Sequence, residues 1–145
     1  MSNSVLEAKP QTDFIETGIN ERGQVADRLS EVLSDSQILM VKTQAVHWNI
    51  TGPLFHSVHT MTEEQYNDLF AAIDIIAERV RALGHLAPTS MASMLKTGNL
   101  QETEDQGDAQ AMLRGLIADN EALVRQVRDV AREAADHIDG ATEDL

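Results

Sequence analysis

Three long stretches of the chain repeat their apolar side chains at the spacing of an α-helix, and this pattern constrains the fold more than any other feature. The stretches run from about residue 24 to 48, from about 55 to 83, and from about 108 to 137. In the second stretch the inward positions lie within roughly 40° of one direction at 100° per residue. They are Val58, Thr62, Leu69, Ile73, Ile76, Val80 and Leu83. The spacing predicts an all-α protein built on three long amphipathic helices.

Helix-breaking residues mark the ends of these stretches. Gly52 and Pro53 end the first helix, and Gly84 ends the second, because glycine supplies a turn and proline cannot continue a helix. Residues 85–107 form a long connection with a short helix expected over 90–96. A connection of this length lets the chain cross over rather than turn straight back. After the third helix, Thr142 is expected to cap a further helix, which is missing from this sequence.

The composition limits the kind of core and the kind of site. The 145 residues suit one domain, and aromatic residues make up only 3% of them, so the core must be aliphatic. There is no cysteine, which excludes disulfides and thiolate metal sites. Any metal must therefore bind to oxygen and imidazole ligands. The net charge of -13 argues against a protein that simply coats nucleic acid, since phosphate binding needs a basic surface.

Residues 1–23 are polar, without a sustained period, and are predicted to form a flexible N-terminal tail. The tail has neither a basic start nor an apolar run, so no signal peptide is expected. No stretch approaches the ~20 apolar residues of a membrane span. We therefore expect a cytoplasmic protein whose helical domain covers residues 24–145.

Five residues with metal-ligand chemistry fall within the central part of the chain: His47, His59, Glu63, Asp74 and Glu78. His59 and Glu63 are four residues apart on the second predicted helix, and so are Asp74 and Glu78. Each pair therefore projects from one face, one turn apart. By helical geometry the two pairs share one stripe that lies beside the apolar stripe, which predicts a site on a flank of the bundle.

Distance along the helix separates the two pairs. His59 and Asp74 are fifteen residues apart, or roughly 22 Å, too far to share one metal within a single chain. An antiparallel copy of the helix across a two-fold axis would bring one subunit's His59 and Glu63 against its partner's acidic pair, giving two sites per dimer. Phe70, on the same stripe, would pack at that contact. Each pair is therefore interpreted as half of a site.

Simpler interpretations of these residues stand beside this one. Two acidic or histidine pairs at this spacing are more often a solvated helix face. His47, near a helix end, is more often a cap or a packed imidazole than a ligand. Trp48, the single tryptophan, is more often a core anchor than a redox participant. The spacing alone leaves these alternatives open.

A family resemblance bears on that choice. The run His47-Trp48-Asn49-Ile50 with Gly52, Phe55 and His59, followed by Asp74-x-x-Ala77-Glu78-Arg79, resembles the signature of the Dps family, the mini-ferritins known as DNA-binding proteins from starved cells. The resemblance extends from about residue 24 to Leu145 and includes Leu83-Gly84, Ala87-Pro88, the long crossover and the closing Thr142-x-Asp144-Leu145. No Glu-x-x-His motif of ordinary ferritins occurs in the sequence.

The resemblance implies a ferritin-like four-helix bundle with a short helix in the crossover, assembled from two-fold dimers into a hollow dodecamer. It implies a ferroxidase that oxidises ferrous iron, usually with hydrogen peroxide, and stores ferric mineral. His47, His59 and Glu63 would be ligands from one subunit, and Asp74 and Glu78 from the other. Trp48 resembles the family residue that takes up an oxidising equivalent. The family usually has Asp where this chain has Glu63.

Two departures from the family pattern qualify these expectations. DNA-binding members typically use a tail rich in Lys and Arg, whereas this tail is net acidic, so weak or no direct DNA binding is predicted. The last long helix of the bundle is missing, so we expect a domain that is incomplete at its C-terminal end. Two alternatives remain: a non-enzymatic, nucleoid-protecting shell with structural metal sites, and an acidic helical interaction module without metal.

Overall fold

The computed structural model describes residues 8–10, 16–103 and 107–145, and these ranges contain helices and connections without any strand. The helices are α1 (Arg22–Asn49), α2 (Phe55–Ala82), α3 (Met91–Thr97), α4 (Ala109–Asp136) and α5 (Gly140–Glu143). The predicted all-α class and the short helix in the crossover are confirmed. Among the described residues, no helix is long and apolar enough to cross a membrane.

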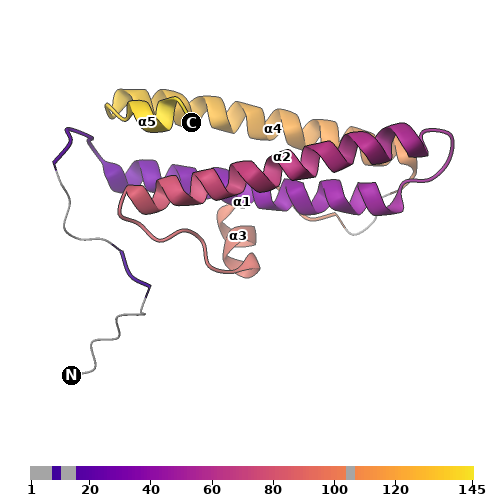
Figure 1. Ribbon diagram of the computed structural model, residues 1–145, viewed down its shortest axis with the longest axis horizontal. Coiled ribbons are helices and arrows are strands. Elements are labelled where there is room, and N and C mark those ends of the chain that lie inside the picture. The colour runs from indigo at the N-terminus through magenta and orange to yellow at the C-terminus, as the bar shows by residue number, and fades with distance from the viewer. Residues whose placement is uncertain (1–7, 11–15, 104–106) are drawn as a thin grey trace, which may run out of the picture.

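The three 28-residue helices run side by side along the long axis of the molecule (Figure 1). α1 is the central element, since it packs against α2, α4 and α3, while α5 packs on the end of α4. Its buried face carries Val25, Leu29, Leu33, Leu39 and Val46. The core is therefore aliphatic, as the low aromatic content predicts.

The helix ends follow the breakers in the sequence. Gly52 and Gly84 have φ values of 89° and 91°, a backbone conformation that glycine adopts without strain. α1 begins at Arg22, two residues before the predicted start. Part of the preceding tail is attached to the bundle, because the amide of Asn20 donates to the carbonyl of His137 at 3.0 Å. The rest of the predicted flexible tail lies largely outside the described residues.

A buried carboxylate on α1 holds the chain where it leaves α3. Asp35 Oδ1 accepts hydrogen bonds from the amides of Asn99 at 2.6 Å and Leu100 at 2.8 Å, and Oδ2 accepts from the Asn99 side chain. Gly98 is required beside it, because a Cβ there would lie 2.6 Å from Asp35 Oδ1. The crossover is thus fixed to the middle of α1.

A polar cluster near the C-terminal end of α2 fixes the start of α5. Arg79 on α2 donates to Thr142 Oγ1 at 2.8 Å and pairs with Asp139 Oδ1 at 2.5 Å. The N-cap of α5 is Asp139, whose side chain accepts from the amide of Thr142. The prediction that Thr142 is the cap is therefore wrong, because Thr142 lies inside the helical turn with its hydroxyl bonded to Asp139 Oδ2.

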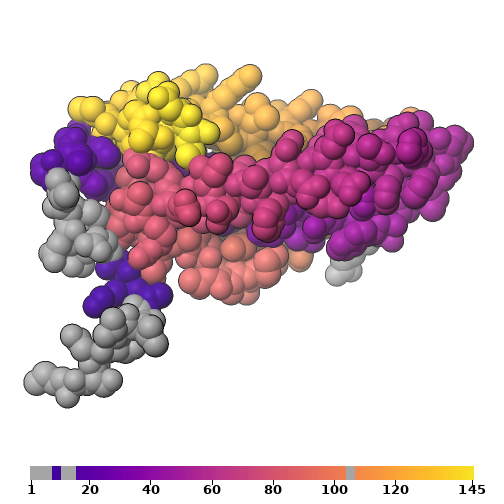
Figure 2. Space-filling view, viewed as in Figure 1, coloured from indigo at the N-terminus to yellow at the C-terminus, as the bar shows by residue number. Residues whose placement is uncertain are grey.

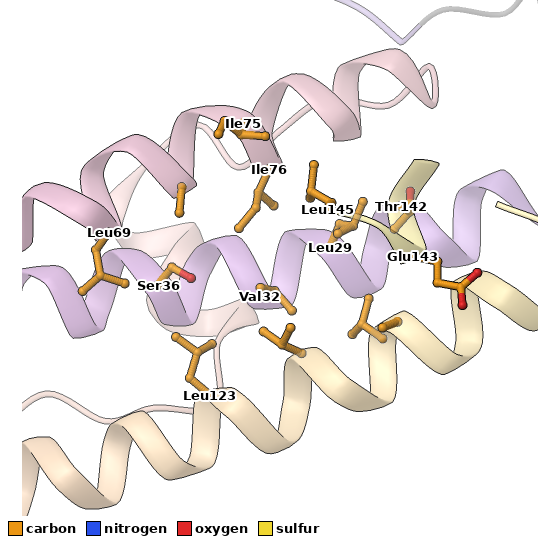
Figure 3. A pocket seen from close by; sticks show the side chains of 14 residues that line it. Leu29, Val32, Ser36, Leu69, Ile75, Ile76, Leu123, Thr142, Glu143 and Leu145 are labelled. Atoms are coloured by element: carbon orange, nitrogen blue, oxygen red, sulfur yellow. The ribbon is translucent and has the colours of Figure 1, made fainter. Parts of the chain in front are cut away.

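The side of the bundle between α2 and α4 is open. A cavity of about 300 Å³ lies there, with side chains such as Ile76, Leu123 and Leu145 pointing into it from α2, α4 and the end of the chain (Figure 3). In the space-filling view α2 lies across the near face and the last residues cover only one end of α4 (Figure 2). Large apolar side chains remain exposed on α2 and α4: Met61, Ile75, Ile117, Val124 and Val127.

Candidate metal site

The end of α1 and the start of α2 bring two histidines into direct contact. The rings of His47 and His59 stack, with centroids 3.7 Å apart and planes 18° from parallel. Nδ1 of His47 lies 2.8 Å from the carbonyl oxygen of His59, and Nδ1 of His59 lies 2.9 Å from the carbonyl oxygen of His47. The two residues therefore hold each other through a reciprocal pair of hydrogen bonds, which we call the histidine clasp.

The histidine clasp determines which ring nitrogen can bind a metal. A carbonyl oxygen can only accept, so Nδ1 of each ring must carry the proton and donate. In the neutral imidazole the other nitrogen, Nε2, then has a free lone pair. Metal-binding histidines are commonly oriented in this way, with the second ring nitrogen donating to a carbonyl. The clasp thus prepares His47 and His59 as two neighbouring nitrogen ligands.

Three further side chains surround the clasp. Thr62 is fully buried, and its hydroxyl lies 3.3 Å from Nδ1 of His47. Tyr66 meets the His47 ring edge-on at a centroid distance of 5.3 Å, and Phe55 stacks on His59 at 5.0 Å. His47 itself is buried. The clasp is therefore enclosed by α2 on one side while Trp48, next to it in the chain, is 68% exposed.

Exposure of Trp48 weakens one alternative interpretation. A core anchor would be buried, and this indole is largely open to solvent. His47, in contrast, is buried and also part of the histidine clasp. The interpretation as a packed imidazole and the interpretation as a metal ligand are therefore compatible for this side chain. Neither observation identifies a redox role for Trp48.

The three carboxylates predicted as ligands are exposed along α2. Glu63 lies one turn after His59, whereas Asp74 and Glu78 lie near the other end of the helix. Among the described residues, no three histidine, cysteine, aspartate or glutamate side chains come together as a metal site. The structure therefore brings His47 to His59, and leaves the acidic pair distant from both.

Exposed apolar side chains accompany the carboxylates on α2. Phe70 is 69% exposed, and Ile75, beside Asp74, is 53% exposed. An exposed aromatic side chain is typical of a contact surface, because aromatic residues are enriched at protein interfaces. Phe70 is the residue that the sequence predicts at a two-fold contact.

Sequence reasoning missed the clasp and the residue beneath it. The periodicity of α2 predicts an inward position for Thr62, and Thr62 is buried. Its contact with His47 depends on how α1 crosses α2, which periodicity does not give. The available signal was weak: Thr62 follows His59 by three residues, and residues at that spacing are neighbours on a helix.

Comparisons with known proteins agree with this fold. A ferritin-like domain model matches residues 26–145. The chain is 40% identical over 127 residues to a low-temperature-induced protein of Nostoc, covering 86% of this chain and 71% of that protein. It is 33% identical over 122 residues to the DNA protection during starvation protein of Brevibacillus brevis, covering 83% and 81% of the two chains.

A solved structure extends the comparison to three dimensions. The DPS protein from Vibrio cholerae O1, a member of the ferritin-like diiron-carboxylate superfamily, superimposes with a TM-score of 0.83 at 29% identity. The match covers 94% of this chain and 85% of that chain. The predicted ferritin-like bundle is therefore confirmed.

Proposed function

Because the chain belongs to the Dps family of ferritin-like proteins, we propose that it is a ferroxidase whose sites form between two subunits. Membership supports iron binding and protection against oxidative damage at the level of the family. The proposal adds hydrogen peroxide as oxidant and storage of ferric mineral in a hollow homo-oligomer, a dodecamer by family. It places this assembly in the bacterial cytoplasm.

The observation that carries the proposal is the histidine clasp. The two imidazoles stack, each has Nε2 left without the proton in the neutral ring, and Glu63 lies one turn after His59. Imidazole and carboxylate together suit ferrous iron, and a set this small leaves positions open for an oxidant.

The second half of each site would come from a neighbour. One chain supplies two imidazoles in contact, the Glu63 carboxylate one turn further along α2, and a carboxylate pair roughly 22 Å away along the same helix. A two-fold axis beside Phe70 would bring the partner subunit's Asp74 and the partner subunit's Glu78 to the clasp. Iron oxidation would then depend on assembly.

The proposed reaction of ferrous iron with hydrogen peroxide balances with water as the only further reactant. Two ferrous ions each lose one electron, and hydrogen peroxide accepts both as its oxygen–oxygen bond breaks. With two waters, the products are two ferric oxyhydroxide units and four protons. The carboxylates neutralise the growing positive charge of the iron and are suited to accept protons released from water. The net charge of -13 favours the approach of ferrous ions from solution.

Stopped-flow absorbance of the ferric product after mixing the anaerobic ferrous protein with peroxide tests the proposal. We expect the rate to fall at least tenfold in His47→Ala and in Asp74→Ala, since each removes one ligand of the shared site. His137→Ala, at the end of α4, and Asp68→Ala, an exposed carboxylate of α2 on another face, are the matched controls.

Rates in His47→Ala and Asp74→Ala that equal those of the two controls would contradict the site assignment. If the wild type formed no ferric product faster than buffer does, the alternative of a non-enzymatic shell with structural metal sites would be favoured.

A further inference from the structure

The buried hydroxyl of Thr62 touches the histidine clasp without belonging to the ligand set. Thr62 lies on the inward face of α2 and has no solvent exposure. Its oxygen lies 3.3 Å from His47 Nδ1, 3.1 Å from the carbonyl oxygen of His59 and 2.7 Å from the carbonyl oxygen of Val58. A buried polar group normally has hydrogen-bond partners, and the contact with His47 is the one that leaves the helix of Thr62.

The number of donors and acceptors on a hydroxyl decides which of these contacts it donates to and which it accepts. Thr62 has one proton to donate, and the shortest contact, to the Val58 carbonyl one turn earlier, takes it. The lone pairs of the same oxygen are then left to face His47. Because Nδ1 of His47 already carries its proton toward the His59 carbonyl, that proton lies between two acceptors.

We propose that Thr62 is a positioning residue of the iron site: its hydroxyl oxygen is the second acceptor for the Nδ1 proton of His47 and so keeps Nε2 of that ring free for metal. The inference rests on the proposed function and extends it to a residue outside the ligand set. The hydroxyl acts in two ways. It favours the Nδ1-protonated tautomer, and it restricts rotation of the ring about its bond to Cβ.

A second threonine provides a matched control. Thr43 on α1 is also buried, and its hydroxyl likewise donates to the carbonyl one turn earlier, that of Leu39, at 2.8 Å. No contact between the Thr43 hydroxyl and either imidazole accompanies this bond. Replacing threonine by valine keeps the shape and removes the hydroxyl, so Thr62→Val and Thr43→Val differ in the contact with His47.

Zinc binding measured by calorimetry on the assembled protein tests the inference, because zinc has no redox chemistry. We expect Thr62→Val to weaken zinc binding about tenfold, the lower end for loss of an outer partner, because the His59 carbonyl remains as an acceptor. Thr62→Ser, which keeps the hydroxyl, should bind within about twofold of wild type, and so should Thr43→Val. The melting temperature of Thr62→Val should not fall, since a buried hydroxyl is replaced by a methyl group.

The tautomer can be measured without any metal. Solid-state NMR of protein labelled with ¹⁵N at histidine, with His47→Ala used for assignment, should show Nδ1-protonated His47 in wild type and Thr62→Ser. A mixture of tautomers is expected in Thr62→Val. An unchanged zinc affinity or an unchanged tautomer in Thr62→Val would overturn the inference, as would an equal loss of affinity in Thr62→Ser.

These outcomes separate the inference from the function on which it rests. If His47→Ala removes zinc binding while Thr62→Val does not weaken it, the site stands and the role of Thr62 fails. If His47→Ala binds zinc as tightly as wild type, the proposed site itself fails, whatever the tautomer of His47.

Discussion

Single buried polar residues hold this bundle together where its connections are long. Asp35 is almost fully buried on α1, yet it accepts two amide hydrogen bonds and one side-chain hydrogen bond from the segment after α3. Apolar contacts would fix this connection less specifically than these hydrogen bonds do, because apolar packing has no preferred direction. The carboxylate therefore positions the crossover, and with it the path of the chain from α3 into α4.

Replacing this carboxylate should destabilise the fold. In Asp35→Ala the amide of Asn99 and the amide of the buried Leu100 lose their acceptor, which should cost about 3 kcal/mol. Urea unfolding followed by circular dichroism measures the loss. Asp27→Ala, at an exposed position of the same helix, should stay within about 0.5 kcal/mol of wild type. Equal stability of the two variants would show that Asp35 does not carry the crossover.

At the scale of elements, α5 is stabilised by side-chain contacts more than by its own helical hydrogen bonds. A four-residue helix has little stability of its own, because helix nucleation is unfavourable. Its first turn is fixed by Asp139, whose buried side chain pairs with Arg79 of α2. The pair joins α5 to the part of α2 that carries Glu78, so the attachment of α5 to α2 depends on Arg79.

Removing that cation should release α5. Arg79→Ala leaves the buried carboxylate of Asp139 without its charged partner, a change that typically costs about 3–5 kcal/mol if the structure does not open. The cheaper response is local opening, so amide hydrogen exchange of Thr142, Glu143 and Asp144 should accelerate. Arg128→Ala, at an exposed position of α4, is the control and should leave the exchange of these amides unchanged. Protection of α5 that persists in Arg79→Ala would contradict this account.

At the scale of the whole molecule, the proposal assigns the two halves of the site to different chains, and mixing two variants tests this. His47→Ala and Asp74→Ala are each inactive in the proposal. In a dimer that contains one copy of each, one site carries both defects and the other carries neither. Random mixing of the two variants, dissociated and reassembled together, should therefore restore about a quarter of the wild-type rate.

The ferric absorbance assay on separate and mixed samples measures this recovery. Ligands that all belonged to one chain would give no recovery on mixing, since every site would then carry one of the defects. Mixing without the dissociation step should also give none and serves as the control.

The charge of the whole molecule bears on DNA. With 24 acidic and 11 basic residues, the chain should repel phosphate at most of its surface. We expect no retention of duplex DNA in gel shifts at moderate salt without divalent ions, whatever the family name of its relatives. A retained complex under these conditions, lost on removal of residues 1–23, would show that the tail binds DNA despite its acidity.

The sequence by itself determined the class, the three long helices and most of their ends. Periodicity and breakers are local properties, so Gly52 and Gly84 could be placed without knowing what lies beside them. Local pattern was less reliable at the caps: α1 starts at Arg22, and Asp139 rather than Thr142 caps α5. The N-cap is the residue whose side chain accepts from the free amides of the first turn. A change in the backbone dihedral angles of a single residue can shift this role to a neighbour.

The tertiary structure alone decided how the candidate ligands meet. The spacing of His59, Glu63, Asp74 and Glu78 on one helix follows from the sequence, and the sequence also separates the two pairs by roughly 22 Å. Three features depend on how α1 crosses α2: the stacking of His47 on His59, the hydrogen bond from each ring to the other residue's carbonyl, and the contact of Thr62 with His47. That crossing is set by side-chain packing between residues distant in sequence, which one-dimensional periodicity does not contain.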